Sequence, residues 1–565
     1  MKQYIVYSFD IFDTLLLRPY ANPQEVWKVL EELEHSPGFA KARKEADAKT
    51  FREAIARNGE TTIEAAYDLI PQYRHLLQKE MDMERQKLRA NPEMLKMWKK
   101  MGELGKRRII VSDMYLPKDF IQDVLRENGI DGWDAFYLSR DFDCRKSSGK
   151  LFREMLLQEG VKPDEVLHIG DNLISDVKIP ESIGIHTRHY QKVIDRLYEI
   201  CPYTRKVDDG LSGVLSIGWH QFLLNNPSAT YWHRLGFMMG GVLGYIYVKW
   251  IVETAKKLGK DRLMFVARDG YVWKAICNEL FPEIRTEYFY APRLTSIAIL
   301  GATGSDPWAI KDRQNYIKQH LKGVDLDAIR REYGKYIKQF NIDEHTAMID
   351  GCSSGFSAQR LVENAVGRNV FCFYLLSMAP MHSAAALYST HLYSMQWQTL
   401  SEFLFGSPEK PVKDVTIEGP KYEQYISDQE KFKMSVSREI SDGAVACAKI
   451  LMNEKVKITA TSWQEYVNQF MLNLTNEDYQ YLSMAKNAGD VMQKLFGSVI
   501  YKPLKRGVFL KKLGPRSISL NYVYGFSHYC FFLNRKGFHY RKKNLRTEFY
   551  KIVNDRVRTE YPPNE

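Results

Sequence analysis

Short apolar segments that end in a polar residue, with helical stretches between them, most constrain the fold of this 565-residue chain. The first is YSFDIFDTLL, residues 7–16, in which Asp10 follows the apolar part. Similar segments occupy residues 106–113, 135–139 and 166–176. Alternating strands and helices predict an α/β fold with a doubly wound parallel sheet, and ligands bind at the carboxyl ends of the strands in such sheets.

Polar side chains follow several of these predicted strands and suit phosphoryl chemistry. Asp10, Ser112, Lys146 and Asp171 lie at strand ends or just beyond them. A carboxylate can attack phosphorus to form an aspartyl-phosphate, and carboxylates also hold Mg²⁺. A hydroxyl and an ammonium group would hold the phosphate oxygens. We therefore predict Asp10 and Asp171 as metal ligands and Ser112 and Lys146 as phosphate-binding groups, with Asp176 as a further ligand or support.

In their order, these motifs resemble those of the haloacid dehalogenase (HAD) superfamily. Asp10 matches its nucleophile, Ser112 its second motif and Lys146 its third, for which Lys150 is the alternative. The acidic fourth motif matches GDNLISD, residues 170–176. The resemblance covers residues 1–205, and it implies that the helical segment 18–102 is a cap that closes over a small substrate.

The sequence departs from the phosphatases of that superfamily at Phe12. Those enzymes usually carry an aspartate there, two residues after the nucleophile, as general acid and base. The resemblance leaves Phe12 only its backbone carbonyl, as a metal ligand. Asp13 comes one position later, and because side chains alternate along a strand, we interpret it as structural. Three explanations stay open: another group serves, the leaving group needs no proton (as in true dehalogenases), or the domain is a binding module.

A second strand–helix alternation follows a predicted linker at 206–232 and predicts a Rossmann-like α/β domain over residues 233–500. Its strands are expected within 262–270, 286–293, 346–357 and 371–376. The polar residues at their ends form a candidate ligand site: Arg268, Asp269, Arg293, Asp350 and Gly351. The turn DGCSSGFS offers backbone N–H groups to an anion, with a simple tight turn as the alternative. The two arginines favour a phosphorylated ligand.

The whole chain resembles two-domain HAD-like proteins seen with bacterial surface-polysaccharide biosynthesis. The resemblance lies in the segments ARDG, YFYAPR and DGCSSG, and in EFLFGSP at residues 402–408, with Cys352 and Ser353 departing from the third pattern. It implies a context, sugar-phosphate or lipid-linked glycan metabolism, but no reaction. The HAD-like motifs of the first domain imply Mg²⁺-dependent phosphohydrolase or phosphotransferase activity on a small phosphorylated substrate, such as a sugar phosphate. The alternative is a non-hydrolytic HAD-like module coupled to a second domain that transfers glycosyl or phosphoglycosyl groups.

The net charge of +11 is concentrated in the C-terminal segment 501–565. Residues 501–546 hold twelve Lys/Arg, ten aromatic residues and no Asp or Glu. A solvated surface is the first interpretation, and an anionic membrane surface the second. Nucleic acid is disfavoured, because no nucleic-acid-binding module is recognisable.

The remaining features predict a cytoplasmic protein, with peripheral association at the inner membrane face if the basic segment binds lipid. No signal peptide is visible. The seven cysteines form no CxxC pair, which favours reduced thiols and no zinc site. The apolar run 235–252 is interrupted by glycines and falls short of the roughly 20 residues of a membrane span, so we expect a buried helix.

Overall fold

The computed structural model divides the chain into two compact units, Met1–Asn225 and Asn226–Glu565. The residues that it describes are 4–207, 209–302, 307–353, 355–377, 383–389, 395–458, 460–488 and 496–498. The predicted basic segment 501–565 therefore lies outside the described residues.

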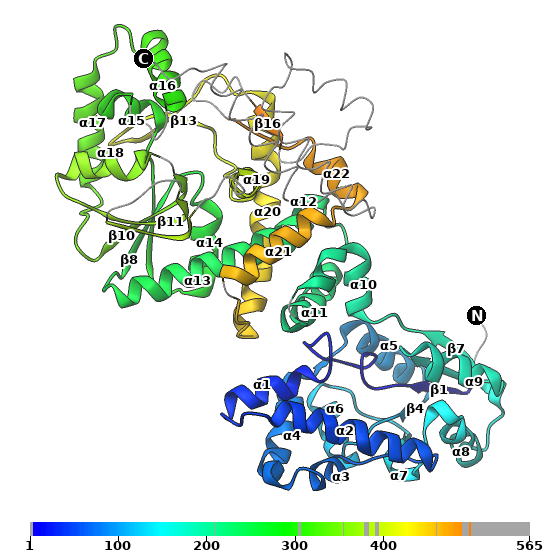
Figure 1. Cartoon of the computed structure of the whole chain (residues 1–565). Coiled ribbons are helices and arrows are strands. Elements are labelled where there is room, and N and C mark those ends of the chain that lie inside the picture. The colour runs from blue at the N-terminus through cyan, green and yellow to red at the C-terminus, as the bar shows by residue number, and fades with distance from the viewer. Residues whose placement is uncertain are drawn as a thin grey trace, which may run out of the picture. The chain divides into compact units, whose positions relative to one another are not determined.

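The first unit contains a parallel five-stranded sheet in the order β5-β4-β1-β6-β7 (Figure 1). Its strands are β1 (Val6–Phe9), β4 (Arg107–Ser112), β5 (Ala135–Leu138), β6 (Val166–Gly170) and β7 (His186–His189). The chain runs from β1 outward through β4 to β5, then crosses back to β6 and continues to β7. The direction of winding thus reverses between β1 and β6, and this switch point is where ligands bind in doubly wound sheets.

Helices cover both faces of this sheet. On one face, α5 (Pro92–Glu103) and α6 (Lys118–Glu127) pack on Phe9 and Ile110. On the other, α8 (Lys150–Glu159) and α9 (Ile179–Ser182) pack on Val6 and Ile109. The shorter elements and the last helices are α7 (Ser139–Phe142), η2 (Lys146–Ser148), η3 (Pro163–Glu165), η4 (Leu173–Lys178), α10 (Val193–Ile200), η5 (Pro202–Lys206) and α11 (Asp209–Asn225).

The predicted helical insertion is present but ends earlier than expected. Its helices are α1 (Glu25–Leu33), α2 (Phe39–Ala56), α3 (Ile63–Asp68), η1 (Pro71–Leu76) and α4 (Leu77–Lys87). An antiparallel ribbon of β2 (Leu16–Leu17) and β3 (Arg89–Ala90) joins its two ends. Helix α5 lies within the predicted cap range but packs on the sheet. Its Trp98 ring meets the Phe9 ring of β1 edge-on, with 5.2 Å between the ring centroids. The cap boundary 18–102 was therefore too wide.

The predicted linker 206–232 is mostly helical, which corrects the sequence interpretation. Helix α11 fills residues 209–225, and the division between the units follows it. Gly213, within this helix, permits close packing. A Cβ there would lie 2.5 Å from the backbone of Pro19 and Tyr20.

The second unit contains another parallel five-stranded sheet, in the order β12-β11-β10-β8-β9 (Figure 1). Its strands are β8 (Arg262–Val266), β9 (Arg285–Phe289), β10 (Thr346–Ser353), β11 (Phe371–Ser377) and β12 (Ala384–Ser389). Winding reverses between β8 and β10, which makes their carboxyl ends a second switch point. The predicted α/β class is confirmed for both units. The edge strands β7 and β12 were missed because of their composition: β7 is HTRH, and β12 begins with three alanines, which are weak strand formers.

The other elements of this unit are mainly helices. They are α12 (Tyr231–Leu235), η6 (Gly236–Gly241), α13 (Val242–Lys257), α14 (Tyr271–Leu280), α15 (Arg293–Leu300), α16 (Pro307–His320), α17 (Leu326–Lys338), α18 (Ser357–Val366), α19 (Met395–Leu404), α20 (Asp428–Asn453), α21 (Ala460–Leu472) and α22 (Asn476–Leu482). Two ribbons complete it: β13 (Val412–Thr416) with β14 (Gly419–Tyr422), and β15 (Lys486–Ala488) with β16 (Phe496–Ser498).

The apolar run of the second unit forms part of a continuous helical stretch, Tyr231–Lys257. Among the described residues it alone is long and apolar enough to cross a membrane, by length and composition. However, 89% of its most apolar window is buried inside the protein. Gly236 and Gly241 pack directly against α20, where a Cβ would collide with Ile440 and Cys447 respectively. These contacts are those of a core helix, as the sequence predicts.

Candidate active site

Asp10 lies directly after β1, at the switch point of the first sheet. Its side chain is buried, and two groups meet on its Oδ1 atom. Ser112 Oγ donates at 3.0 Å and Lys146 Nζ at 2.6 Å. Among the described residues, Oδ2 receives no hydrogen bond. Burial raises the pKa of Asp10 to about 7, and the nearby charges of Asp176 and Asp171 add to this, while Lys146 opposes them.

Two further carboxylates join Asp10 from the end of β6. One oxygen each of Asp10, Asp171 and Asp176 lies within 4.8 Å of the others. After β6 the chain enters the π-helical turn η4, where Asn172 caps the N–H groups of Ile174 and Ser175. Gly170 makes room for this arrangement, since a Cβ there would lie 2.5 Å from Asp176 Cγ. The predicted metal ligands Asp10, Asp171 and Asp176 are thus brought together.

Asp176 is the most strongly held of the three carboxylates. It accepts from Lys146 Nζ at 2.5 Å, from His168 Nε2 at 3.2 Å and from the Asn172 backbone N–H at 3.0 Å. Burial alone would raise its pKa, but Lys146 and His168 outweigh this and hold the pKa of Asp176 below its ordinary value. His168 is fixed in turn by Ser8 Oγ, 2.8 Å from Nδ1.

The structure places Lys146, and not Lys150, in the site. Lys146 lies in the short turn η2 with its side chain 2% exposed, and its ammonium joins Asp10 to Asp176. Its backbone N–H donates to Asp113 Oδ1 at 2.7 Å, which fixes the turn. Burial would lower the pKa of Lys146, but the two carboxylates raise it above the ordinary value. Lys150 is exposed at the start of α8.

Lys192 is a second ammonium group of the site, which the sequence interpretation missed. Its Nζ lies 3.0 Å from Asp171 Oδ2 and 3.2 Å from Asp13 Oδ2. Asp13 itself has a left-handed backbone with φ 56°. Lys192 follows the edge strand β7, which was not predicted, so no local signal marked it. His168 was missed because it lies inside β6 and not at its end.

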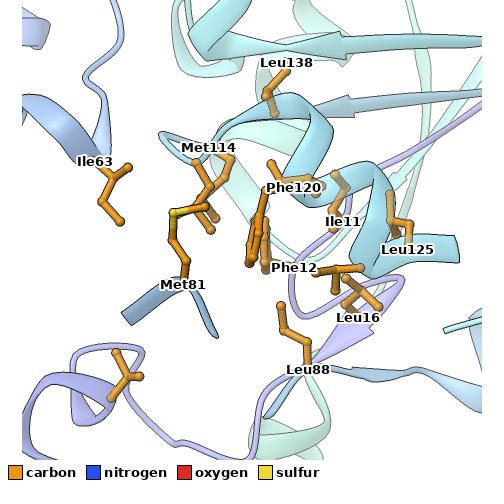
Figure 2. Packing of buried hydrophobic residues seen from close by; sticks show 14 of the residues in the cluster. Ile11, Phe12, Leu16, Ile63, Met81, Leu88, Met114, Phe120, Leu125 and Leu138 are labelled. Carbon is orange, nitrogen blue, oxygen red and sulfur yellow. The ribbon is translucent and has the colours of Figure 1, made fainter. Parts of the chain in front are cut away.

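The side chain of Phe12 lies in the hydrophobic core and not in the polar site. It is 8% exposed and packs with Ile11, Leu16 and Phe120 (Figure 2). The guanidinium of Arg18 lies 4.2 Å from the centre of its ring. The position of the usual second aspartate therefore carries no proton donor. That its carbonyl binds metal stays a prediction.

In the second unit, four of the five predicted ligand residues gather at the switch point. Arg268 and Asp269 follow β8, whereas Asp350 and Gly351 lie at the matching level of β10. Arg268 has a left-handed backbone with φ 74°. A Cβ on Gly351 would lie 3.6 Å from Asp269 Oδ2, so these two segments touch. Arg293 begins α15, after β9.

No protein-family model and no curated protein matches this chain. HAD-family hydrolases are among the solved structures that are similar to part of this chain. The putative HAD-hydrolase YfnB from Bacillus subtilis is 17% identical, with 35% of this chain and 99% of that one covered and a TM-score of 0.27. The HAD family enzyme bt-2542 from Bacteroides thetaiotaomicron is 16% identical, with 35% and 99% covered and a TM-score of 0.28.

An L-2-haloacid dehalogenase from Xanthobacter autotrophicus is 18% identical, with 35% of this chain and 83% of that one covered and a TM-score of 0.27. These similarities concern about a third of the chain, and at such identities and TM-scores they carry no information on activity. What the first unit can do follows from its own side chains: a buried carboxylate with one unpartnered oxygen, two more carboxylates beside it, and a hydroxyl and two ammonium groups around them.

Proposed function

We propose that the first unit is a Mg²⁺-dependent phosphohydrolase or phosphotransferase that acts on a small phosphorylated substrate through an aspartyl-phosphate on Asp10. The observation that supports this proposal is the set of groups around the Asp10 carboxylate. Its Oδ1 is held by Ser112 and Lys146, and two further carboxylates lie within 4.8 Å. Oδ2 is left for attack. A buried aspartate serving only the fold would have both oxygens bonded.

The carboxylates suit the metal that this chemistry needs. Mg²⁺ takes oxygen ligands and is commonly bound by one or two carboxylates together with substrate phosphate. Asp10, Asp171 and Asp176 supply such oxygens from two adjacent strand ends, so they would hold the ion. The bound ion would offset the negative charge of a phosphate next to the attacking carboxylate.

The steps assigned to the chain are attack and release. Asp10 Oδ2 forms a bond to phosphorus as the bond from phosphorus to the leaving oxygen breaks. Ser112 and Lys146 bind the transferred phosphoryl oxygens. Water, or an acceptor hydroxyl, then attacks phosphorus, which breaks the bond to Asp10 and restores the carboxylate. The attacking group loses a proton, and the leaving oxygen gains one unless it is stable as an anion.

The side chain of Phe12 cannot exchange these protons, which favours substrates whose leaving oxygen is already a weak base. A glycosyl diphosphate or another phosphoanhydride meets this condition better than a simple alkyl phosphate. Sugar phosphates of surface-polysaccharide biosynthesis are the substrate class that we propose to test first, and within this class the sugar diphosphates meet the condition on the leaving oxygen. A cytoplasmic location, with the basic segment 501–565 at an anionic membrane surface, belongs to the same proposal.

The test is phosphate release from sugar phosphates, sugar diphosphates and nucleotides, with Mg²⁺ and with EDTA. Wild type should release phosphate with Mg²⁺ but not with EDTA. Asp10→Asn should release no phosphate under either condition. Asp164→Asn, on the exposed turn η3, is the matched control and should behave as wild type. An acid-quenched phosphoenzyme that hydroxylamine cleaves should form in wild type even if the natural acceptor is not water. Full activity in a folded Asp10→Asn variant would refute the proposal.

A further inference from the structure

The second switch point carries charged groups that the proposed function does not involve, and they come from the sequence segments that the first unit does not explain. ARDG supplies Arg268 and Asp269, DGCSSG supplies Asp350, and EFLFGSP supplies Glu402. Tyr288 of YFYAPR accepts a hydrogen bond from the Arg268 backbone N–H at 2.7 Å. Segments spread over about 140 residues of sequence thus converge beside the ends of β8 and β10.

Helix α20 adds a buried lysine to this group. The side chain of Lys433 is largely buried, and it passes so close to Gly406 that a Cβ on this glycine would collide with Lys433 Cε. Burial, together with the charge of Arg268, lowers the pKa of Lys433, although Asp269, Glu430 and Glu402 act in the opposite direction. All these charged groups therefore lie within electrostatic reach of the lysine.

Two carboxylates in this group, the buried Asp350 and the partly buried Asp269, have few partners among the described residues. Asp350 is 9% exposed, and its only hydrogen bond within the described part of the chain comes from the Gly351 N–H to Oδ1, at 2.8 Å. No hydrogen bond or ion pair from a described residue reaches Asp269. Burial and the charges of Asp269 and Glu402 raise the pKa of Asp350 to about 7. A buried carboxylate without a partner lowers the stability of the fold by about 1–3 kcal/mol or more, unless a ligand binds it.

The surrounding donors are also incompletely used. Arg268 pairs with Glu430 at 2.5 Å through one amino group, but its buried Nε has no partner among the described residues. The buried Trp273 Nε1, on a ring that lies 3.1 Å from the Cβ position of Gly351, has none either. Donors and acceptors that stay unpaired side by side in a folded core mark a place prepared for a ligand.

We infer that the second switch point is an independent binding site for a phosphorylated ligand carried as its divalent-metal complex. Asp269 and Asp350 provide the metal's protein oxygens, and Arg268 and Lys433 provide the cations that face the phosphate. Two carboxylates with substrate phosphate are a usual set of Mg²⁺ ligands. A site made only of carboxylates would favour a bare cation, and a site made only of arginine and lysine would favour a bare phosphate. Because this site contains both kinds of group, it favours a complex of the cation with the phosphate.

The test uses the full chain carrying Asp10→Asn and Asp171→Asn, which disables the first metal set. Mn²⁺ binding is measured by electron paramagnetic resonance, with and without inorganic pyrophosphate. This background should still bind about one Mn²⁺ per chain. Pyrophosphate should tighten that binding by about tenfold, the strength of a single charge-assisted contact.

Further variants in the same background assign the residues. Asp350→Asn should remove Mn²⁺ binding, and Lys433→Met should keep Mn²⁺ binding but lose the effect of pyrophosphate. Glu279→Gln, which removes an exposed partner of Lys449 in the same unit, is the control and should change neither. If Asp350→Asn fails to melt cooperatively, Asp269→Asn takes its place, because this side chain is only partly buried.

Three results would overturn the inference. They are no Mn²⁺ bound in the background variant, Mn²⁺ binding that survives in folded Asp350→Asn or Asp269→Asn, and pyrophosphate binding that is equally strong without metal. None of them bears on phosphate release by the wild-type first unit, so this inference and the proposed function can fail separately.

Discussion

Both sheets are parallel and doubly wound, although their strand orders differ, and the charges at their switch points are balanced in different ways. In the first unit, Lys146 lies between Asp10 and Asp176 with both contacts at 2.6 Å or less, and the carboxylates raise its pKa. In the second, burial lowers the pKa of Lys433 in spite of three nearby carboxylates. The comparison shows that sheet topology determines where polar groups gather. Side-chain contacts determine which of these groups have compensating partners in the absence of a ligand.

The largest expected difference concerns these two lysines. Lys146→Met leaves two buried carboxylates without their cation and should lower the free energy of unfolding by about 3–5 kcal/mol. Lys433→Met removes an ammonium group that is already poorly stabilised, so it should cost less than about 1 kcal/mol. Urea unfolding of both variants, followed by hydrogen exchange in β1 and β8, checks this. Equal losses would mean that the two switch points do not differ as described.

Two glycines give a smaller contrast of the same kind. Gly170→Ala places a methyl group 2.5 Å from Asp176 Cγ, in a short side chain fixed by Lys146 and His168. It should cost about 1–3 kcal/mol and abolish phosphate release. Gly406→Ala meets only the far end of the longer Lys433 side chain and should cost less. Melting curves and phosphate-release assays of both variants measure these effects. A Gly170→Ala variant with wild-type stability and activity would contradict the tight placement of Asp176.

Asp13 tests how the first site is supported. Because Lys192 bridges Asp13 and Asp171, Asp13→Asn should leave this lysine less well placed and weaken Mg²⁺ activation by about 10-fold, within the range for groups behind metal ligands. The maximal rate at saturating Mg²⁺ should change little. A loss of 10²-fold or more that added Mg²⁺ does not restore would instead identify Asp13 as the missing acid and base.

The smallest effect is the pH dependence of Lys433→Met. The pKa of Lys433 is lower in the folded protein than in the unfolded chain, where it is about 10.4. The folded state therefore binds fewer protons, and the contribution of Lys433 to stability rises with pH between its folded and unfolded pKa values. Burial sets this shift and the charge of Arg268 adds to it, whereas the nearby Asp269, Glu430 and Glu402 oppose it. Wild type should gain stability relative to Lys433→Met as the pH rises toward the unfolded pKa of about 10.4, measured by urea unfolding; a relative loss would contradict the direction.

Much of the first site was predictable because its residues adjoin strands. Asp10, Ser112 and Asp171 follow apolar segments directly, so the parallel sheet had to bring them to one edge. Phe12 was also recognisable as a departure, and its side chain indeed lies in the core. The cap boundary was too wide, because periodicity does not reveal whether a helix packs on a cap or on the sheet. The division between the units falls within the predicted linker 206–232, but the helix α11 inside it was not expected.

The sequence by itself determined the alternation of strands and helices, the α/β class and the polar residue at each strand end, since these follow from short-range patterns of apolar residues. Only the tertiary structure decided which distant groups meet them. Lys192 reaches Asp13 across 179 positions, and Arg268 pairs with Glu430 across 162. Such pairs depend on sheet order and helix packing, which local periodicity does not encode, and at both switch points they decide which charges are compensated.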